Sequence, residues 1–395
     1  MKFYLKALPL AISVALVPAA AFADEATDAK VAQLEQQVQA LQAQQTKNLT
    51  DKFNFNGFIS GAYISSDNDA GYNNATSSAD FTQDSKMGLQ ATFNISNQTQ
   101  AVLQLMMKGE NDWDVEAEWA YLSHRFDNGV KVRGGKLRVP LFMYSDYLDV
   151  GYAQPFARPP GEVYDQVPFS SYTGGDIAYD FEFEDSTLTL QGFGGESDVS
   201  GEATSLDLSN IMGVNASWTD LTWTLRAVYG QTDLDGSASG GALVIDGEQA
   251  QFTGLGGSYD NGSFIAITEW TTVEIEGLLA DHESAYVTLG YRIKAFTPYV
   301  TVAYAKTTDD DVRSALPPQL AIPLGLGLNE ERTAYSAGVR WDAIDNVAIK
   351  FDLTYATDFG DTSGGLGGNA VVNPLTKQFL FDDTLVYTVK FDAVF

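Results

Sequence analysis

The chain has 395 residues, and its 52 acidic against 23 basic residues give a formal net charge of −29. The sequence contains no cysteine, which excludes a disulfide framework, a cysteine-ligated metal site and a cysteine nucleophile. The acidic charge disfavours nucleic acid as a partner, because binding to nucleic acid depends on Lys and Arg that neutralise phosphates.

Residues 1–23 have the features of a secretory signal peptide. Lys2 and Lys6 precede a short apolar run at residues 8–17, and the sequence AFA at residues 21–23 fits the small-residue cleavage pattern. The run is shorter than the ~18 residues of a membrane-spanning helix, and no later run approaches that length. Cleavage after AFA removes both lysines and changes the net charge from −29 to −31. The mature chain is then either soluble or crosses a membrane as β-strands.

Residues 24–50 are expected to form a short coiled coil. Its seam consists of Val31, Leu34, Val38 and Leu41, whose spacing of three, four and three residues is typical of the a and d positions of a heptad. A single helix of this size is marginal in water, so the seam predicts self-association. The alternative is a polar linker in which the spacing arose by chance.

From residue 51 onward, apolar and polar residues alternate many times. In residues 86–95 and 347–355 one face of each segment is apolar and the other is polar or charged. Because successive side chains of a strand point to opposite faces, these segments are expected to be β-strands. We predict sixteen of them, at residues 52–64, 84–96, 99–109, 114–125, 130–139, 174–184, 186–195, 207–219, 221–232, 249–259, 263–274, 283–294, 296–307, 331–342, 346–358 and 384–395.

A soluble sandwich and a transmembrane barrel both produce this alternation. The barrel is favoured because most strands reach about 10 residues, because aromatic residues recur near strand ends, and because short and long connections alternate. Asp127-Asn128-Gly129 and Asp260-Asn261-Gly262 are typical of tight hairpin turns. Long polar loops are expected at residues 65–83, 140–173, 196–206, 233–248, 308–330 and 359–381.

The last strand ends the chain with an apolar face that includes Tyr387, Phe391 and Phe395. This pattern resembles the assembly signal of outer-membrane proteins, and residues 51–395 resemble the trimeric porins of Gram-negative bacteria. The resemblance implies a cell outer membrane location, a homotrimer, contact with lipid and lipopolysaccharide, and insertion by the barrel assembly machinery. The segment at 24–50 would then be periplasmic, and it resembles an extension of some substrate-preferring porins.

In that family the third extracellular loop folds into the barrel and narrows the pore, with acids facing basic residues on the wall. The connection at residues 140–173 stands in this place and holds five of the twelve prolines together with eight Phe and Tyr residues. This composition predicts a folded insert rather than a flexible loop. Its acids are Asp146, Asp149, Glu162 and Asp165. The family's usual Pro-Glu-Phe-Gly-Gly element is absent from it.

The strand before this loop is unusually basic. Lys131, Arg133, Lys136 and Arg138 cannot share one face under strict alternation, so we predict a bulge at Gly134-Gly135 that turns all four into the lumen. Further candidate bases of the pore wall are Arg226, Arg292, Lys294, Arg332, Arg340 and Lys350.

The expected function is passive diffusion of ions and small hydrophilic solutes, with selectivity set by pore width and lining charge. The acidic net charge favours cations. Two alternatives are a porin that prefers small anions such as dicarboxylates, and a structural or adhesive outer-membrane protein. We expect no enzymatic activity, cofactor or metal: Ser123 and His124 are adjacent on a strand and therefore point to opposite faces, so they cannot form a nucleophile–base pair directly.

Overall fold

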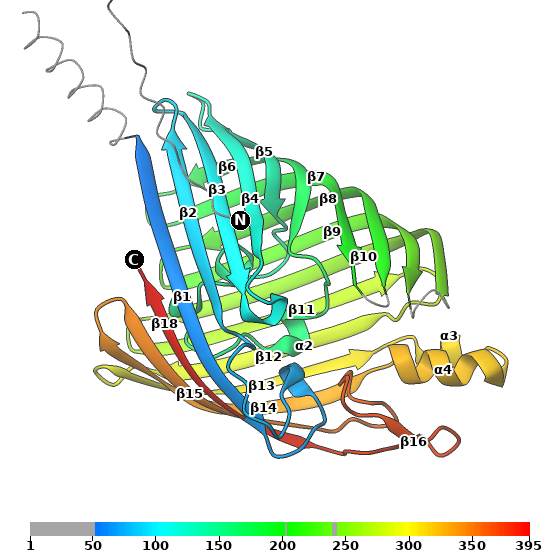
Figure 1. The fold of residues 1–395 in the computed structure, drawn as a ribbon. Helices are drawn as coiled ribbons and strands as arrows, with labels where there is room; N and C mark the ends of the chain where they lie inside the picture. The colour runs from blue at the N-terminus through cyan, green and yellow to red at the C-terminus, as the bar shows by residue number, and fades with distance from the viewer. Residues whose placement is uncertain (1–51, 202–203, 239–242) are drawn as a thin grey trace, which may run out of the picture. The chain divides into compact units, whose positions relative to one another are not determined.

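The fold is described from a computed structural model, which covers residues 52–201, 204–238 and 243–395. Within these residues, sixteen antiparallel strands close into a barrel (Figure 1). Each strand pairs with its neighbour in sequence except near the end, where β15 pairs with β18. β18 then pairs with β1 and closes the ring. The predicted 16-stranded antiparallel barrel is confirmed.

All sixteen predicted strands are present. The barrel strands are β1 (Phe53–Ser66), β2 (Lys86–Asn94), β3 (Thr99–Lys108), β4 (Val115–Arg125), β5 (Lys131–Arg138), β6 (Ser171–Glu182), β7 (Thr187–Ser200), β8 (Ser205–Thr219), β9 (Trp223–Ala238), β10 (Leu243–Asp260), β11 (Phe264–Ile275), β12 (His282–Tyr291), β13 (Phe296–Thr307), β14 (Glu331–Ile344), β15 (Val347–Thr357) and β18 (Thr384–Val394).

The two faces of the barrel are set by the alternation in the sequence. In β13, Val300 and Val302 are exposed on the outer face, whereas Tyr299 and Thr301 are buried inside. An exposed apolar face is the reverse of a soluble sandwich, in which the apolar face is covered. Lipid chains rather than water suit this outer surface.

The last strand follows the same rule and completes the ring. Tyr387 and Phe391 are exposed on the outer face, and Lys390 and Asp392 are buried on the inner face. The backbone N–H of Gly57 donates to the carbonyl O of Phe395 (2.8 Å), and the N–H of Phe395 donates to the carbonyl O of Gly57 (2.9 Å). The final residue therefore takes part in barrel closure.

Short turns join the strands at one end of the barrel. Gly129 and Gly262 have φ values of 90° and 86°, which are accessible to glycine at little cost, and they confirm the two predicted tight turns. The connections at the other end are longer and include η1 (Tyr72–Asn74), η2 (Gly109–Asn111), α3 (Asp310–Ser314), α4 (Pro318–Leu328) and the small hairpin of β16 (Val371–Asn373) and β17 (Gln378–Phe379). None of the helices in the described part of the chain has the length and apolar character needed to cross a membrane.

The prediction of loops at residues 196–206 and 233–248 is wrong. β7 and β8 keep pairing as far as Ser200↔Ser205, and β9 and β10 pair from Leu243↔Ala238. Gly, Asp and Ser in these segments suggest loops, but pairs of buried apolar residues two positions apart lie at or next to the strand ends: Leu206 and Leu208 of β8, and Leu243 and Ile245 of β10. This alternation gives each strand tip an apolar inner face, so the hairpins extend beyond the predicted ends.

The expected signal peptide at 1–23 and the coiled-coil seam of Val31, Leu34, Val38 and Leu41 lie outside the described residues. Both stay predictions.

Candidate functional site

The connection between β5 and β6, residues 139–170, lies inside the ring of strands (Figure 1). It contains three short helical turns, η3 (Ser145–Tyr147), η4 (Gly151–Ala153) and α2 (Gly161–Tyr164). α2 contacts the inner wall at β11, β12 and β13. We call residues 139–170 the inner loop.

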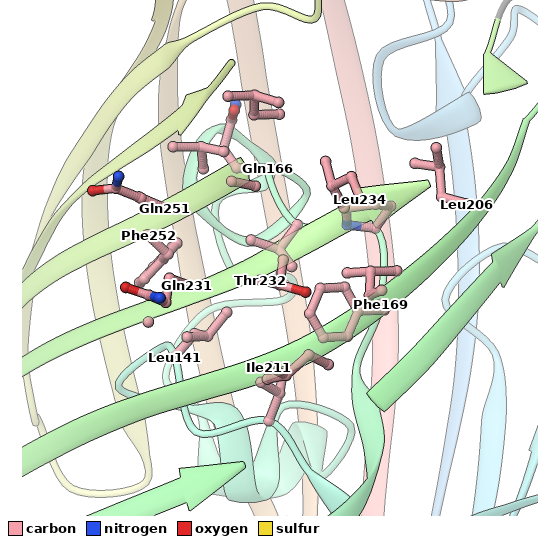
Figure 2. Close-up of a pocket in the computed structure, with 18 of the residues that line it drawn as sticks. Leu141, Gln166, Phe169, Leu206, Ile211, Gln231, Thr232, Leu234, Gln251 and Phe252 are labelled. Carbon is pink, nitrogen blue, oxygen red and sulfur yellow. The ribbon is translucent and has the colours of Figure 1, made fainter. Parts of the chain in front are cut away.

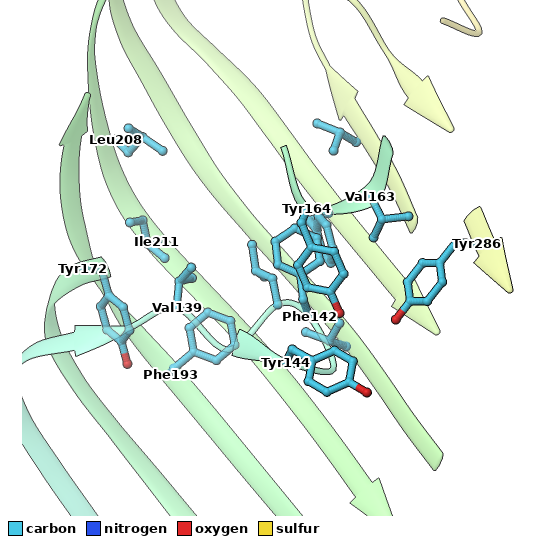
Figure 3. Close-up of a cluster of buried hydrophobic side chains, with 14 of the residues drawn as sticks. Val139, Phe142, Tyr144, Val163, Tyr164, Tyr172, Phe193, Leu208, Ile211 and Tyr286 are labelled. Atoms are coloured by element: carbon cyan, nitrogen blue, oxygen red, sulfur yellow. The ribbon is translucent and has the colours of Figure 1, made fainter. Parts of the chain in front are cut away.

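Aromatic side chains hold the inner loop against the wall (Figure 3). Phe142 lies 5.0 Å from Tyr164 between ring centroids, Tyr144 lies 5.6 Å from Phe156, and Tyr164 lies 6.2 Å from Tyr286 of β12. All five rings are buried. Such pairs add to the stability supplied by burial of their apolar area, so the loop is a packed insert.

A buried carboxylate of the wall receives three donors from this cluster. Glu269 of β11 accepts hydrogen bonds from the backbone N–H of Met143 (2.7 Å), the hydroxyl of Tyr164 (2.6 Å) and the hydroxyl of Tyr286 (3.4 Å). The sequence analysis missed Glu269. The sequence feature that could have identified it is a single acid on the otherwise largely apolar inner face of β11, where Ile265, Ile267 and Val273 also lie.

Asp149 of the inner loop is the centre of a buried ion network. Its carboxylate lies 2.9 Å from Nζ of Lys86, 2.7 Å from Nη1 of Arg138 and 3.9 Å from Nζ of Lys108. Arg138 also pairs with Glu118 at 2.8 Å. Burial opposes ionisation of Asp149, but Lys86 and Arg138 outweigh it and hold the pKa of this carboxyl well below its ordinary value.

Glu162 forms the second ionic anchor of the inner loop. This fully buried carboxylate lies 2.7 Å from Nε of Arg332 on β14 and accepts a hydrogen bond from the hydroxyl of Tyr72 (3.2 Å). Arg332 also lies 3.2 Å from Glu330. The carboxylate therefore joins the inner loop to β14 and to the connection between β1 and β2.

Four wall bases bind backbone carbonyls of the inner loop. Arg226 of β9 donates to the carbonyl O of Pro140. Lys350 donates to the carbonyl O of Gly151 (2.7 Å), and Lys390 donates to that of Ala157 (3.0 Å). Arg340 donates to the carbonyl oxygens of Tyr152 (2.6 Å) and Gln154 (3.0 Å). The sequence analysis named Lys350 and Arg340 but missed Lys390. The alternation of the last strand could have found Lys390, because it lies opposite the apolar face.

The predicted bulge in β5 is absent. Ser123↔Arg133 through Ala120↔Lys136 pair without a register shift, and so do β5 and β6. Glycines of β5 lie opposite glycines of β6 at Gly134↔Gly175 and Gly135↔Gly174, so the strands remain in register with little side chain between them. Arg133 pairs with Asp176 through Nη2 at 2.5 Å.

The remaining predicted site residues differ in their surroundings. Arg292 lies 2.5 Å from Asp260, and Arg340 lies 2.8 Å from Asp342. Asp165 lies 3.3 Å from Arg158. Among the described residues, Asp146 of the inner loop and Lys131 and Lys136 of β5 have no oppositely charged partner within 4 Å.

The geometry gives several of the predicted residues an anchoring role. Asp149, Glu162, Lys350 and Arg340 hold the inner loop in place, whereas Asp146 is exposed. That any of these residues lines a passage stays a prediction. In the part of the chain that the structure describes, no three His, Asp or Glu side chains form a cluster that could hold a metal ion.

Comparisons with known proteins agree on the fold. A model of the Gram-negative porin family matches residues 10–366. OmpT of Vibrio cholerae in a trimer form is 12% identical, with a TM-score of 0.56 over 87% of this chain and 99% of that chain. The outer-membrane channel DcaP of Acinetobacter baumannii is 11% identical, with a TM-score of 0.55 over 87% and 97%. An anion-selective porin from Comamonas acidovorans is 13% identical, with a TM-score of 0.53 over 87% and 99%. A comparison with curated proteins finds no match.

Proposed function

Because this chain belongs to the Gram-negative porin family, a family of outer-membrane channels rather than enzymes, we propose that it conducts small hydrophilic solutes and ions by passive diffusion, with a preference for cations. The inner loop would narrow the passage, and the groups that remain at its edge would set selectivity. What we propose is the class of solutes and the preference for cations. Family membership itself supports only an outer-membrane channel.

The pairing of the wall bases is the observation that carries the cation preference. Six of the ten predicted wall bases lie within 2.8 Å of a carboxylate oxygen: Arg133, Arg138, Arg292, Arg332, Arg340 and Lys350. A paired base contributes little net positive potential to a passage. The chain carries 52 acidic against 23 basic residues, so the remaining field favours cations.

Asp146 is the inner-loop acid best suited to act on a permeating ion. It is exposed, and its carboxylate acts electrostatically on Arg133 of β5 and Arg226 of β9. Asp149 and Glu162, by contrast, are buried in their ion pairs. We therefore assign Asp146 to the edge of the passage and the other two acids to loop anchoring.

The test is the reversal potential of the purified oligomer in planar bilayers under a KCl gradient. We expect stable conductance that scales with bulk salt conductivity and a reversal potential that indicates K⁺ preference over Cl⁻. A clear preference for Cl⁻ would contradict the cation assignment. A folded barrel that shows no conductance would contradict the channel proposal and favour the structural or adhesive alternative.

We also propose that the protein is a homotrimer. One of the structural neighbours is a trimer form, although at 12% identity this likeness supports only the shared fold. Conductance steps grouped in threes and a trimeric mass by light scattering are the expected results. A monomeric mass in mild detergent, with single steps, would contradict the proposal.

The alternative of a porin that prefers small anions also has an observation in its favour. Lys131 and Lys136 on β5 have no acid within 4 Å among the described residues, so they could attract an anion. Saturable block of the current by succinate at low concentration would favour this alternative. A current that succinate does not reduce in a saturable way would count against it.

A further inference from the structure

Part of the inner wall is apolar, although a water-filled barrel is expected to have a polar interior. Leu206 and Leu208 of β8, Leu234 of β9, Phe252 of β10 and Val273 of β11 face inward. Leu206, Leu208, Leu234 and Val273 lie toward the end of the barrel that carries the long connections, which in this family is the extracellular end, and Phe252 lies near the middle of β10. A continuous apolar surface therefore covers the inner wall from β8 to β11.

A cavity lies between this surface and the two ends of the inner loop (Figure 2). Leu141, Val167 and Phe169 of the inner loop line one side, and the strands line the other. Its empty volume is about 710 Å³, open space at its mouth included. Among the described residues that line it, none is charged.

Docking of the inner loop explains only part of this surface. The loop ends do pack on the wall, but they leave room beside them. A Cβ atom added to Gly230, which lines the cavity, would lie 3.5 Å from Cδ2 of Leu141 and 3.7 Å from Cζ of Phe193, at ordinary contact distance. A wall built solely to receive the loop would be expected to pack at the density of a protein interior.

The cavity is continuous with a wider one at the extracellular end. Val273, Ile275, Leu279 and Gln166 line both, and the wider cavity, of about 1200 Å³ including open solvent, also contacts the end of α4 and the connection before β18. The side-chain amide of Gln166 donates to the carbonyl O of Glu162 (3.0 Å) and to Oε1 of Glu330 (2.7 Å). Gln166 lines both cavities, and among the described residues no donor reaches its Oε1.

We infer that this apolar cavity is a binding site for an uncharged small molecule with an aromatic or alicyclic body and one hydrogen-bond donor. The ring would contact the leucines and Phe252, and the donor would reach Oε1 of Gln166. A charged solute is disfavoured, because a charge in this cavity would lose its hydration without a partner. The inference deepens the proposed function, on which it rests for the entry of solutes from the extracellular side.

Indole is the probe for this site, because it is an uncharged ring system with a single N–H donor. Calorimetric titration of indole into the purified oligomer in detergent micelles, with micelles alone as the blank, measures binding. In planar bilayers, indole added on the extracellular side should reduce the ionic current in a saturable way. The same titration with glycerol, which has no apolar body, should give neither signal.

The variant Ala250→Phe places a ring in the cavity from the inner face of β10. We expect it to weaken indole binding about tenfold or more, since the ring occupies the ligand's space. The matched control is Ala227→Phe, which adds the same ring at an exposed position on the outer face of β9 and should leave binding unchanged. Gly230→Val is a second filling variant and should act like Ala250→Phe. Correct folding is checked by heat modifiability for each.

The outcomes separate the inference from the proposed function. Conductance without indole binding, or binding that Ala250→Phe and Gly230→Val leave unchanged, overturns the inference and leaves the channel intact. Binding that both filling variants abolish, in a barrel that does not conduct, supports the site and contradicts the channel.

Discussion

At the scale of single residues, the interior of this barrel is organised by buried charges that have close partners. Asp149 has three basic neighbours, and Glu162 has a guanidinium and a tyrosine hydroxyl. A buried ion pair adds little stability when compared with an apolar pair, but the loss of one partner is costly because the other charge remains buried. These acids therefore fix the position of the inner loop.

Asp149→Asn should loosen the inner loop. It removes the carboxylate that faces Lys86 and Arg138, and a destabilisation of about 2–4 kcal/mol is expected for buried bases left without their partner. We expect a lower temperature for the heat-modified shift on gels and larger fluctuations of the open-channel current. Asp185→Asn, at an exposed turn position, is the control and should change neither. Unchanged current noise in Asp149→Asn would show that the aromatic cluster alone holds the loop.

The same carboxyl predicts a pH dependence. A group whose folded pKa is depressed stabilises the fold at pH values above its unfolded pKa of about 3.9, and this contribution is lost as pH falls through the lower folded pKa. Because the pKa of Asp149 is held well below its ordinary value, the loop should stay docked at pH 4 and loosen only in stronger acid. Current noise recorded between pH 7 and pH 3 checks this. A rise in noise already between pH 6 and pH 5 would contradict it.

At the scale of elements, the glycines of β5 and β6 let neighbouring strands run close together. Gly135 has a φ of 134°, a conformation that side-chain-bearing residues rarely adopt, and a Cβ there would lie 2.3 Å from the carbonyl O of Ala120. Gly135 thus marks a close approach between β4 and β5, and the strands pair there without the predicted bulge.

Gly135→Ala should destabilise the barrel, because the added Cβ forces the backbone of β4 to move. We expect a loss of more than about 1 kcal/mol in the free energy of unfolding, measured by urea titration of the refolded protein. Gly192→Ala on β7 is the matched control, since a Cβ there meets its nearest neighbour, Cγ2 of Ile177, at 3.8 Å. Equal stability of the two variants would contradict the close-approach argument.

At the scale of the whole molecule, selectivity depends on the sum of charges that remain after pairing. Most predicted wall bases are neutralised by carboxylates, and the chain has a formal net charge of −29. Under the proposed function, a field of this sign would raise the local concentration of cations in the passage. The inner loop has two exposed acids, Asp146 and Asp165, and only Asp165 has a base within 4 Å among the described residues, Arg158 at 3.3 Å.

Asp146→Asn should reduce the preference for K⁺ over Cl⁻ without changing the fold. The side chain is exposed and has no ion-pair partner within 4 Å among the described residues, so its removal costs no buried interaction. The reversal potential in a KCl gradient is expected to move toward zero, and more so at low salt, where screening is weaker. Asp185→Asn again serves as control. An identical reversal potential in both variants would place Asp146 away from the conduction path.

Much of the barrel could be predicted from the sequence, because strand alternation is a local property. The two-residue period placed all sixteen strands, and a tight turn needs only a few residues such as Asn128 and Gly129. The errors were also local. Gly and Asp at 196–206 and 233–248 outweighed the alternating positions Leu206 and Leu208 of β8 and Leu243 and Ile245 of β10 in the prediction.

The partners of the charged residues were decided only by the tertiary structure. Composition identified a folded insert with acids and a wall with bases, but Glu162 and Arg332 are 170 residues apart and meet only because the barrel closes and the loop folds into it. Closure also brings Asp392 beside Lys350, at 2.8 Å. Alternation assigns each side chain to a face. The choice among the many opposite charges on the inner face depends on how the strands and the loop are arranged in space.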